Sequence, residues 1–148
     1  MTLVRPRRAA DLPGCVAALR AVHEADAYPL NWPLDPVGWL DPPGLVRAWV
    51  AELPEGTIAG HVAIQAGELS RLFVTPAARR RAVGTALVSE ATAWAAAHDV
   101  ELSLEVTDEQ RSAAVAFYAA TGWQHSHTTQ ADWTGPDGGP VQLRRYTR

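Results

Sequence analysis

The chain has 148 residues, a length that suits a single domain with a substantial apolar core. Its 47% hydrophobic and 20% charged residues are ordinary for a globular protein, and no apolar run reaches the 18 residues of a membrane span. All 13 basic residues are arginine and are outnumbered by 16 acidic ones, and the net charge of −3 argues against nucleic-acid binding.

The cysteine content and the first residues indicate where the protein resides. Cys15 is the single cysteine and has no partner for an internal disulfide, so we expect a reducing, cytoplasmic environment. It falls on the apolar stripe of a predicted helix, and we expect it to be buried there. No signal peptide is recognised, so neither export nor a membrane partner is expected.

The first third of the chain predicts a strand, a helix and a broken segment. Residues 2–7 alternate as in a strand, and Asp11 is expected to cap a helix that runs to about residue 27. Five prolines between residues 28 and 44 favour short turns, with one helical turn near residues 37–40.

Three strands follow, expected over residues 47–53, 58–65 and 68–74. Ala66-Gly67 suits a tight hairpin between the last two. The remaining elements are a helix over 83–98, a strand over 101–106, a helix over 112–121 ended by Gly122, and strands over 123–129 and 141–147. A Gly/Pro-rich loop that carries Trp133 joins the last two strands. This order predicts one mixed α/β sheet covered by helices.

The segment from Leu69 to Val88 predicts an anion site. A strand ends at Pro76, three arginines follow, and a turn of small residues opens a helix. The first amides of a helix have no internal acceptor and lie in the positive end of its dipole. Small side chains allow a phosphate to approach, and the arginines add charge. We therefore expect a pyrophosphate cradle formed by Arg79, Arg80, Arg81, Ala82, Val83, Gly84 and Thr85.

Two motifs resemble those of the GNAT superfamily of acyl-CoA-dependent N-acyltransferases. The family's Gln/Arg-x-x-Gly-x-Gly/Ala motif is matched by Arg79-x-x-Ala82-x-Gly84, and we expect Ala82 to take helical angles in place of the first glycine. Ala114-Val115-Ala116-Phe117-Tyr118 followed by Thr121-Gly122-Trp123 is similar to the family's A-x-x-F-Y-x-x-x-G-F ending. Arg111 stands where many members carry asparagine, and we expect it to replace that contact to the cofactor.

The resemblance implies a fold and a cosubstrate. The fold is an α/β mixed sheet of about seven strands and about four helices, with splayed central strands, in one domain over residues 1–148. Acetyl-CoA would lie in the gap between the strand ending at Val74 and the strand over 101–106. Its pantetheine arm would bond to the backbone of Leu72 and Val74, and the amides of residues 80–85 would surround its pyrophosphate.

The resemblance also implies catalytic residues. Tyr118 would protonate the leaving thiolate, with a core aromatic as its alternative role. Glu68 matches the strand position at which several members carry their base; a solvated hairpin carboxylate is the other interpretation, and His61 is the alternative base. Ser70 shares the face of Glu68 and could relay a proton, although a β-bulge would change which residues face the gap. The backbone N–H of Val74 would polarise the thioester carbonyl.

Acids and tryptophans between residues 23 and 56 favour a cationic acceptor. The expected contacts are Tyr28, Trp32, Asp35, His61 and Trp133; the alternative is that the tryptophans pack on the sheet and the acids cap turns. No metal-ligand spacing is found, and the absence of lysine excludes a P-loop kinase. The sequence thus predicts an N-acetyltransferase that moves acetyl directly to a primary amine of a small acceptor in a ternary complex. An N-terminal peptide acetyltransferase and a non-catalytic CoA-binding module are the alternatives, and a homodimer is left open.

Overall fold

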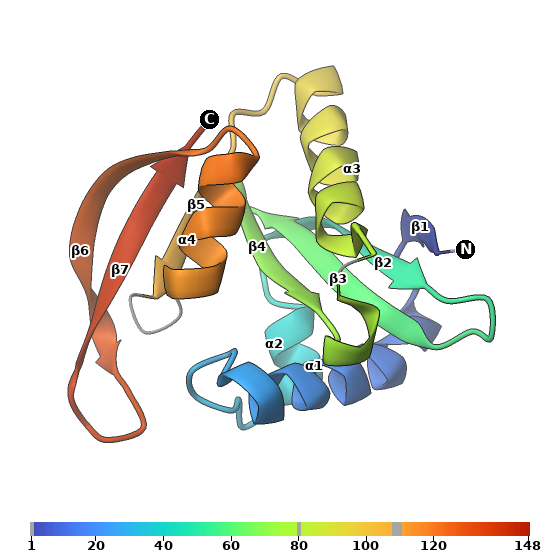
Figure 1. Ribbon diagram of the computed structural model, residues 1–148, viewed down its shortest axis with the longest axis horizontal. Helices are drawn as coiled ribbons and strands as arrows, with labels where there is room; N and C mark the ends of the chain where they lie inside the picture. Colours follow the sequence, from blue (N-terminus) through green and yellow to red (C-terminus); the bar gives the residue numbers. More distant parts are fainter. Residues whose placement is uncertain (1, 80, 108–110) are drawn as a thin grey trace.

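The computed structural model describes residues 2–79, 81–107 and 111–148 (Figure 1). They form a seven-stranded mixed sheet of order β1-β2-β3-β4-β5-β7-β6. The strands are β1 (Leu3–Pro6), β2 (Leu45–Glu52), β3 (Ile58–Gln65), β4 (Glu68–Val74), β5 (Ser103–Thr107), β6 (Gln124–Thr134) and β7 (Pro140–Thr147). The helices are α1 (Leu12–Asp26), α2 (Pro36–Leu40), α3 (Val83–Ala97) and α4 (Arg111–Ala120), with short 3-10 turns η1 (Ala9–Asp11) and η2 (Pro76–Ala78). The mixed sheet and the four helices confirm the predicted fold class.

Helices cover both faces of the sheet. α1 and α2 pack on one face, where Cys15, Leu19 and Leu40 meet Phe73 of β4. α3 packs on the other face, and Tyr118 of α4 belongs to the same cluster. Cys15 is fully buried, as expected, and burial raises the pKa of its thiol to about 11. Figure 1 shows α3 and α4 standing on either side of β4, the strand that the site is built around.

The N-terminal junction differs from the prediction in one detail. Asp11 precedes α1, but its carboxylate makes no capping bond to that helix. Its two oxygens instead accept from both terminal nitrogens of Arg5, at 2.8 and 2.9 Å, and one also accepts from the backbone N–H of Arg8. The bidentate guanidinium pair takes precedence because it is a charge-assisted interaction, and it lowers the pKa of Asp11 to about 2.

The β3–β4 hairpin has the predicted two-residue turn. Ala66 and Gly67 both take positive φ, and Gln65 pairs with Glu68. Further along β4 the register shifts, because two residues of β4 oppose one of β3 between the pairs His61–Phe73 and Ala63–Ser70. Arg71 lies in this bulge with φ 54°. The bulge changes which side chains of the second half of β4 face α3.

β4 and β5 separate close to the first residue of each strand. Their parallel register consists of one pair, Glu68 with Ser103, among the residues that the structure describes. β5 continues along β7 through all five of its residues. The sheet is therefore held together on both sides of the gap while β4 and β5 separate, as the splayed strands of the prediction require.

The C-terminal hairpin is longer than expected. β6 extends to Thr134, so Trp133 lies in a strand and not in a loop. The strand continues past the expected end at residue 129 because β7 keeps pairing with it, with a register shift between Gln130 and Thr134. α4 ends at Ala120, one residue before the predicted end, and Gly122 follows with φ 91°.

Candidate active site

The first turn of α3 is partly exposed, with Val83 buried and Thr85 at the surface. The helix begins at Val83, and the first intrahelical bond runs from the amide of Ala86 to the carbonyl of Ala82. The amides of Val83, Gly84 and Thr85 therefore have no acceptor within the helix. Arg81, Ala82 and Thr85 are exposed. This turn offers outward-pointing donors at the positive end of a 15-residue helix.

Ala82 does not take the helical angles that the sequence led us to expect. Its φ is 58° and its ψ is 23°, in the left-handed region. An L-residue is strained there, and glycine is the residue that adopts this conformation freely. The substitution of the family's first glycine by alanine thus has a conformational cost at the start of the cradle.

The arginines before α3 have different surroundings. Arg79 donates to the carbonyl of Val74 and forms an ion pair with Asp26 at the end of α1. Arg81 is exposed, and Arg80 lies outside the described residues. Arg111 is the first residue of α4, but its side chain is also outside them. Of the arginines in this segment that the structure describes, Arg79 is thus bound within the protein and Arg81 is exposed.

The edge of β4 that faces the gap carries a backbone N–H that β3 does not use. Thr75 donates its N–H to Ala59 of β3. Since successive N–H groups of a strand point to opposite edges, the N–H of Val74 points away from β3 and toward the gap. Leu72 lies in the bulge, so alternation does not orient its N–H. The side chains of Leu72 and Val74 pack against the α3 cluster. An extended ligand arm could therefore bond to β4 as an additional strand.

Tyr118 of α4 lies on the other side of this gap. Its ring is 8% exposed and packs against Phe117, Trp123 and Tyr146. Burial raises the pKa of its hydroxyl well above the usual tyrosine value, and the field of Tyr28 adds to the effect. The phenol therefore stays protonated at neutral pH. The structure also brings Tyr118 near Tyr28, which comes from the opposite face of the sheet.

Glu68 lies at the apex of the gap, at its pair with Ser103. One carboxylate oxygen accepts from Nη1 of Arg145 at 3.2 Å, and Nη2 of Arg145 donates to Oγ of Ser103 at 2.7 Å. The Glu68 side chain is about one-third exposed, so it remains reachable. Ser70 follows two residues later, and its Oγ is buried without a hydrogen-bond partner in the described part of the chain.

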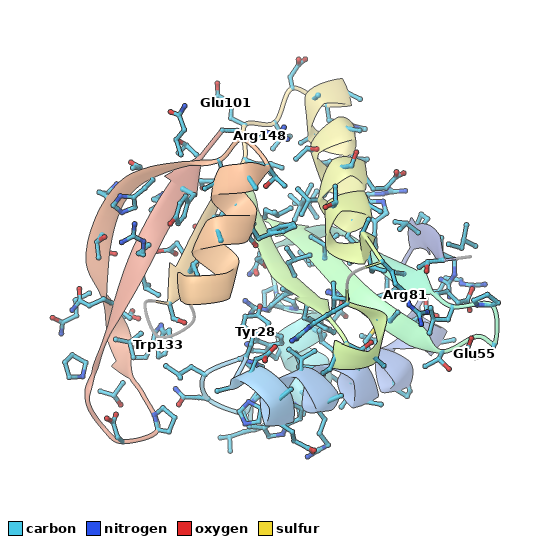
Figure 2. The ribbon with its side chains drawn as sticks, viewed as in Figure 1. Tyr28, Glu55, Arg81, Glu101, Trp133 and Arg148 are labelled. Atoms are coloured by element: carbon cyan, nitrogen blue, oxygen red, sulfur yellow. The ribbon has the colours of Figure 1, made fainter. Side chains whose placement is uncertain are left out.

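Arg71, Trp39 and Tyr28 form a cluster beside the bulge. The guanidinium of Arg71 lies 4.0 Å from the centre of the Trp39 ring, and its Nε donates to the Trp39 carbonyl at 3.1 Å. Tyr28 packs edge-on against Trp39, and burial raises the pKa of its hydroxyl to about 12. In Figure 2, Tyr28 lies between α1 and the lower end of α4.

His61 is placed inside the protein and not on the wall of the gap. The ring is fully buried and stacks on Phe73. Nδ1 bonds to the carbonyl of Arg71 at 2.8 Å, and Nε2 lies 3.0 Å from Nη1 of Arg7. A carbonyl only accepts and a guanidinium only donates, so His61 is neutral with its hydrogen on Nδ1. Burial lowers its pKa to about 4. This environment favours a structural role over contact with a substrate.

The other expected acceptor contacts are dispersed. Trp32 packs on α1, with His23 beside its ring and Arg20 over it. Asp35 caps α2 by accepting from the amide of Gly38. Trp133 is 40% exposed on the side of the β6–β7 ribbon that faces Tyr28 in Figure 2. The following residue, Thr134, accepts from Asn31, so the segment after Tyr28 reaches the ribbon.

Several of the acids counted in favour of a cationic acceptor have partners within the protein. Asp26 pairs with Arg79, Asp41 with Arg7 and Glu52 with Arg5. Together with the cap made by Asp35, these contacts match the alternative interpretation, in which the acids serve the fold. The residues that the sequence did not single out are Arg71 and Arg145.

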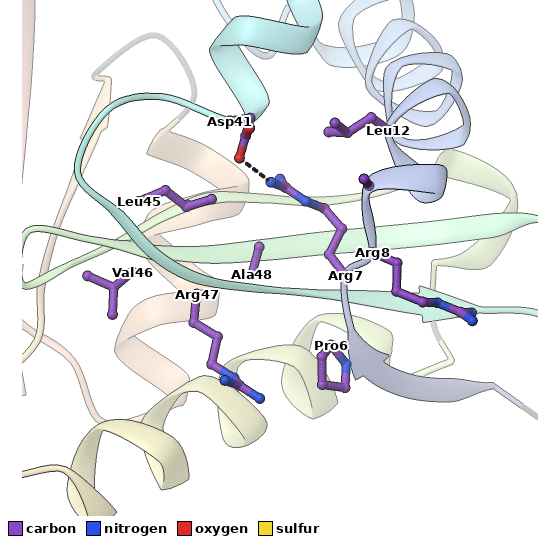
Figure 3. Close-up of a pocket in the computed structure, with 10 residues that line it drawn as sticks. Pro6, Arg7, Arg8, Leu12, Asp41, Leu45, Val46, Arg47 and Ala48 are labelled. Atoms are coloured by element: carbon purple, nitrogen blue, oxygen red, sulfur yellow. Dashed lines mark hydrogen bonds and ion pairs between the residues drawn. The ribbon is translucent and has the colours of Figure 1, made fainter.

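A pocket of about 370 Å³ lies away from this gap, between β1, β2 and the end of α2 (Figure 3). Arg7 projects into it but is bound to Asp41, to the Leu40 carbonyl and to His61. The Arg7 guanidinium is thus bound by groups of the protein itself. Among the described residues, no group of three or more His, Cys, Asp or Glu could hold a metal ion, and no helix is long and apolar enough to cross a membrane.

A family model described as the acetyltransferase (GNAT) family matches residues 15–123, which is most of the chain. The chain belongs to the GNAT acetyltransferase family. It is therefore an acyltransferase, and its mixed sheet with parted strands is a GNAT fold. No curated protein sequence matches the chain.

Solved GNAT structures share this fold over the whole chain. The ribosomal-protein-S18-alanine N-acetyltransferase from Escherichia coli superposes with a TM-score of 0.78 at 19% identity, covering 99% of this chain and 93% of its own. NAA60 from Arabidopsis thaliana in complex with acetyl-CoA gives 0.77 at 14% identity, covering 100% and 98%. A GCN5-related N-acetyltransferase from Kribbella flavida gives 0.71 at 24% identity, covering 99% and 96%.

Proposed function

We propose that this protein is an acetyl-CoA-dependent N-acetyltransferase that acylates a primary amine of a small acceptor by direct transfer in a ternary complex. The observation that carries the proposal is the parting of β4 from β5 beyond the pair Glu68–Ser103, beside the partly exposed first turn of α3. A strand edge with a free amide and a helix start with free amides match the two polar parts of coenzyme A, its pantetheine amides and its pyrophosphate.

The chain offers a complete set of contacts for acetyl-CoA. The amides of Val83, Gly84 and Thr85 would hold the pyrophosphate, with Arg81 adding positive charge. A Cβ at position 84 would lie in van der Waals contact with the Phe117 ring, 3.6 Å away, so glycine leaves that space between α3 and α4 unfilled. Leu72 and Val74 would bond to the pantetheine arm through their backbone. The acetyl-CoA complex of NAA60 supports this use of the shared fold.

The residues at the end of the arm supply the chemistry. The amine must lose a proton, since an alkylamine with a pKa of about 10.4 is neutral in only ~0.04% of molecules at pH 7. Glu68 would accept that proton, directly or through Ser70 and water. The amine nitrogen then forms a bond to the thioester carbon while the Val74 N–H stabilises the carbonyl oxygen. The carbon–sulfur bond breaks, and Tyr118 gives its proton to the departing thiolate.

Two alternatives make different predictions. A non-catalytic CoA-binding module would bind acetyl-CoA but would release no thiol with any amine. A peptide N-terminal acetyltransferase would prefer peptides to free amines. The segment of residues 28–44 crosses the α1–α2 side of the site, and Asn31 bonds to Thr134 across it, which favours an acceptor smaller than an extended peptide.

The test of the proposal is acetyl-CoA binding measured by calorimetry. Thr85→Glu adds a carboxylate to the first turn of α3, where it favours the helix but repels a pyrophosphate. The matched control is Ser89→Glu, which adds the same charge one turn further along the same exposed helix face. We expect the first variant to lose affinity and the control to keep it. Equal affinity for all three proteins would refute the cradle.

A screen of small amines that follows free thiol then tests turnover. We expect thiol release to depend on both the amine and the protein. Tight acetyl-CoA binding with no release for any amine or peptide would favour the non-catalytic module.

A further inference from the structure

Several arginines among the described residues have carboxylate partners. Arg5 pairs with Asp11, Arg7 with Asp41, Arg79 with Asp26 and Arg145 with Glu68. These pairs offset the cost of holding a guanidinium against the protein surface. Two half-buried arginines differ from them, since Arg71 and Arg144 form no ion pair among the described residues; Nε of Arg144 donates to the Tyr146 hydroxyl on β7.

Arg71 is the one of the two that lies on β4, three residues from the proposed base Glu68. It is partly buried, yet it forms no ion pair within the described residues. Its Nε is bound to the Trp39 carbonyl, and the Trp39 ring covers its plane. The two terminal nitrogens have no hydrogen-bond acceptor in the same set of residues. Burial lowers the pKa of Arg71 because the guanidinium loses water, and the fields of Tyr28 and Glu68 oppose this shift.

Ser70 gives a second, independent observation. Its Oγ is buried and has no hydrogen-bond partner among the residues described. Leu69 packs on the α3 side of the sheet, so Ser70 faces the α1–α2 side by strand alternation. Arg71 reaches the same side, because the bulge places its guanidinium on Trp39 near α2. Two guanidinium nitrogens and a hydroxyl that have no hydrogen-bond partner among the described residues therefore lie on adjacent residues.

Ser70 and Arg71 lie close in sequence to the residues proposed to act on the acceptor amine. Glu68 precedes Ser70 by two residues on the same face, and the Val74 N–H follows Arg71 by three. Ser70 and Arg71 thus lie between the proposed base and the proposed oxyanion donor. A group bound to them would hold a nearby amine beside Glu68.

We propose that Arg71 and Ser70 bind a carboxylate of the acceptor, so that the substrate is an amine that carries a carboxylate close to its nitrogen, as a free amino acid does. This inference rests on the proposed acetyl transfer. The two terminal nitrogens of Arg71 match the two oxygens of a carboxylate, and the Ser70 hydroxyl supplies a third donor. The acceptor is then anionic at one end, contrary to the cationic acceptor that the composition suggested.

The experiment compares matched acceptors. Each of the common L-amino acids is paired with its own carboxamide, which keeps size and amine but removes the negative charge. We expect at least one amino acid to have a kcat/KM about 10- to 100-fold above that of its carboxamide, the range of a hydrogen-bonded charge. Carboxamides that react as well as their acids would overturn the inference.

Variants then assign the preference to these side chains. Arg71→Gln is expected to remove most of the excess of kcat/KM for the acid over that for its carboxamide. Arg71→Lys should retain part of this excess, and Ser70→Ala should reduce it less than Arg71→Gln does. Arg47→Gln removes an exposed arginine on β2 as the control and should leave the ratio unchanged. A loss of folding alone would lower both rates together and keep the ratio, so a ratio that survives in Arg71→Gln contradicts the proposal.

Calorimetry with acetyl-CoA distinguishes failure of the carboxylate site from failure of the proposed function. Bound acetyl-CoA and turnover of amines without acid preference would leave the proposed function standing and reject the carboxylate site. Absence of acetyl-CoA binding would reject the function itself. If acetyl-CoA binds but no amine reacts, the amino acids are titrated into the CoA-loaded protein. Amino-acid affinity that is the same in the wild type and in Arg71→Gln would reject the carboxylate site.

Discussion

Arg145 of β7 donates a hydrogen bond to Glu68 of β4, although 77 residues separate them. The same guanidinium bonds to Ser103 of β5, the register partner of Glu68. Arg145 therefore links three strands at the point where the sheet begins to open. Glu68 has a structural contact and a proposed catalytic role at the same position, and the two roles can be separated by mutation.

Glu68→Gln tests the catalytic role. The amide can still accept a hydrogen bond from Arg145 but cannot take a proton from the amine, so we expect kcat/KM to fall by about 10²–10⁴-fold. Arg145→Gln breaks the link and leaves the carboxylate, and we expect a smaller loss. The measurement is thiol release under saturating acetyl-CoA. Equal losses in the two variants would assign Glu68 to holding the strands.

Tyr118→Phe removes one hydroxyl from a packed ring. The contacts of the ring with Trp123 and Tyr146 remain, so we expect little change in the melting temperature. The leaving thiolate loses its proton donor, and kcat should fall by about 10²–10⁴-fold. Unchanged kcat in a folded variant would place Tyr118 in the core alone.

The pH profile gives a further check on Tyr118. Burial raises the pKa of its hydroxyl above the ordinary tyrosine range. Activity that needs the protonated phenol should therefore persist to a higher pH than a free tyrosine would allow. A decline of kcat near pH 10, the value of an unperturbed tyrosine, would contradict this assignment.

The local parts of the fold were predictable from the sequence. The turn at Ala66-Gly67 and the alternation on both sides of it set the β3–β4 hairpin, and β3 and β4 have the predicted bounds. The start of α3 follows from small residues after an arginine run. Each of these features depends on neighbours within a few residues, which is what periodicity and turn chemistry report.

The parts that depend on distant contacts were not predictable. Nothing in the sequence distinguishes Arg71 as a residue with positive φ; the bulge is fixed by Trp39, which binds its side chain, and by His61, which binds its carbonyl. The pairing of Asp26 with Arg79 joins residues 53 apart. A count of acids along the chain could not show that such carboxylates form ion pairs with arginines of the same chain.

Ala82→Gly is expected to stabilise the protein. Relief of the left-handed conformation of Ala82 returns about 1–2 kcal/mol, and the added freedom of the unfolded chain removes about 0.4–1 kcal/mol. The unfolding free energy should rise by about 0.5–1 kcal/mol, measured by urea titration. Ala86→Gly is the control: it lies on the exposed face of α3 one turn later and should lose about 1 kcal/mol. A loss in both variants would contradict the strain at Ala82.

His61 links stability to pH through the bulge of β4. Its buried ring has a pKa of about 4 in the folded protein, against about 6.5 in an unfolded chain. Between these pH values His61 is protonated in the unfolded chain but neutral in the folded protein. The unfolding free energy should therefore fall as pH falls from about 6.5 to 4, with a slope that approaches about 1.4 kcal/mol per pH unit.

His61→Asn isolates this contribution because asparagine does not titrate and its amide can still donate to the Arg71 carbonyl. We expect the variant to be less stable at pH 7, where the packed ring is lost, and to approach the wild type as pH falls. Urea titrations of both proteins at several pH values give the difference directly, and they cancel groups common to both, such as Asp11. A stability difference that stays constant between pH 7 and 4 would mean that His61 is protonated as readily in the folded protein as in the unfolded one.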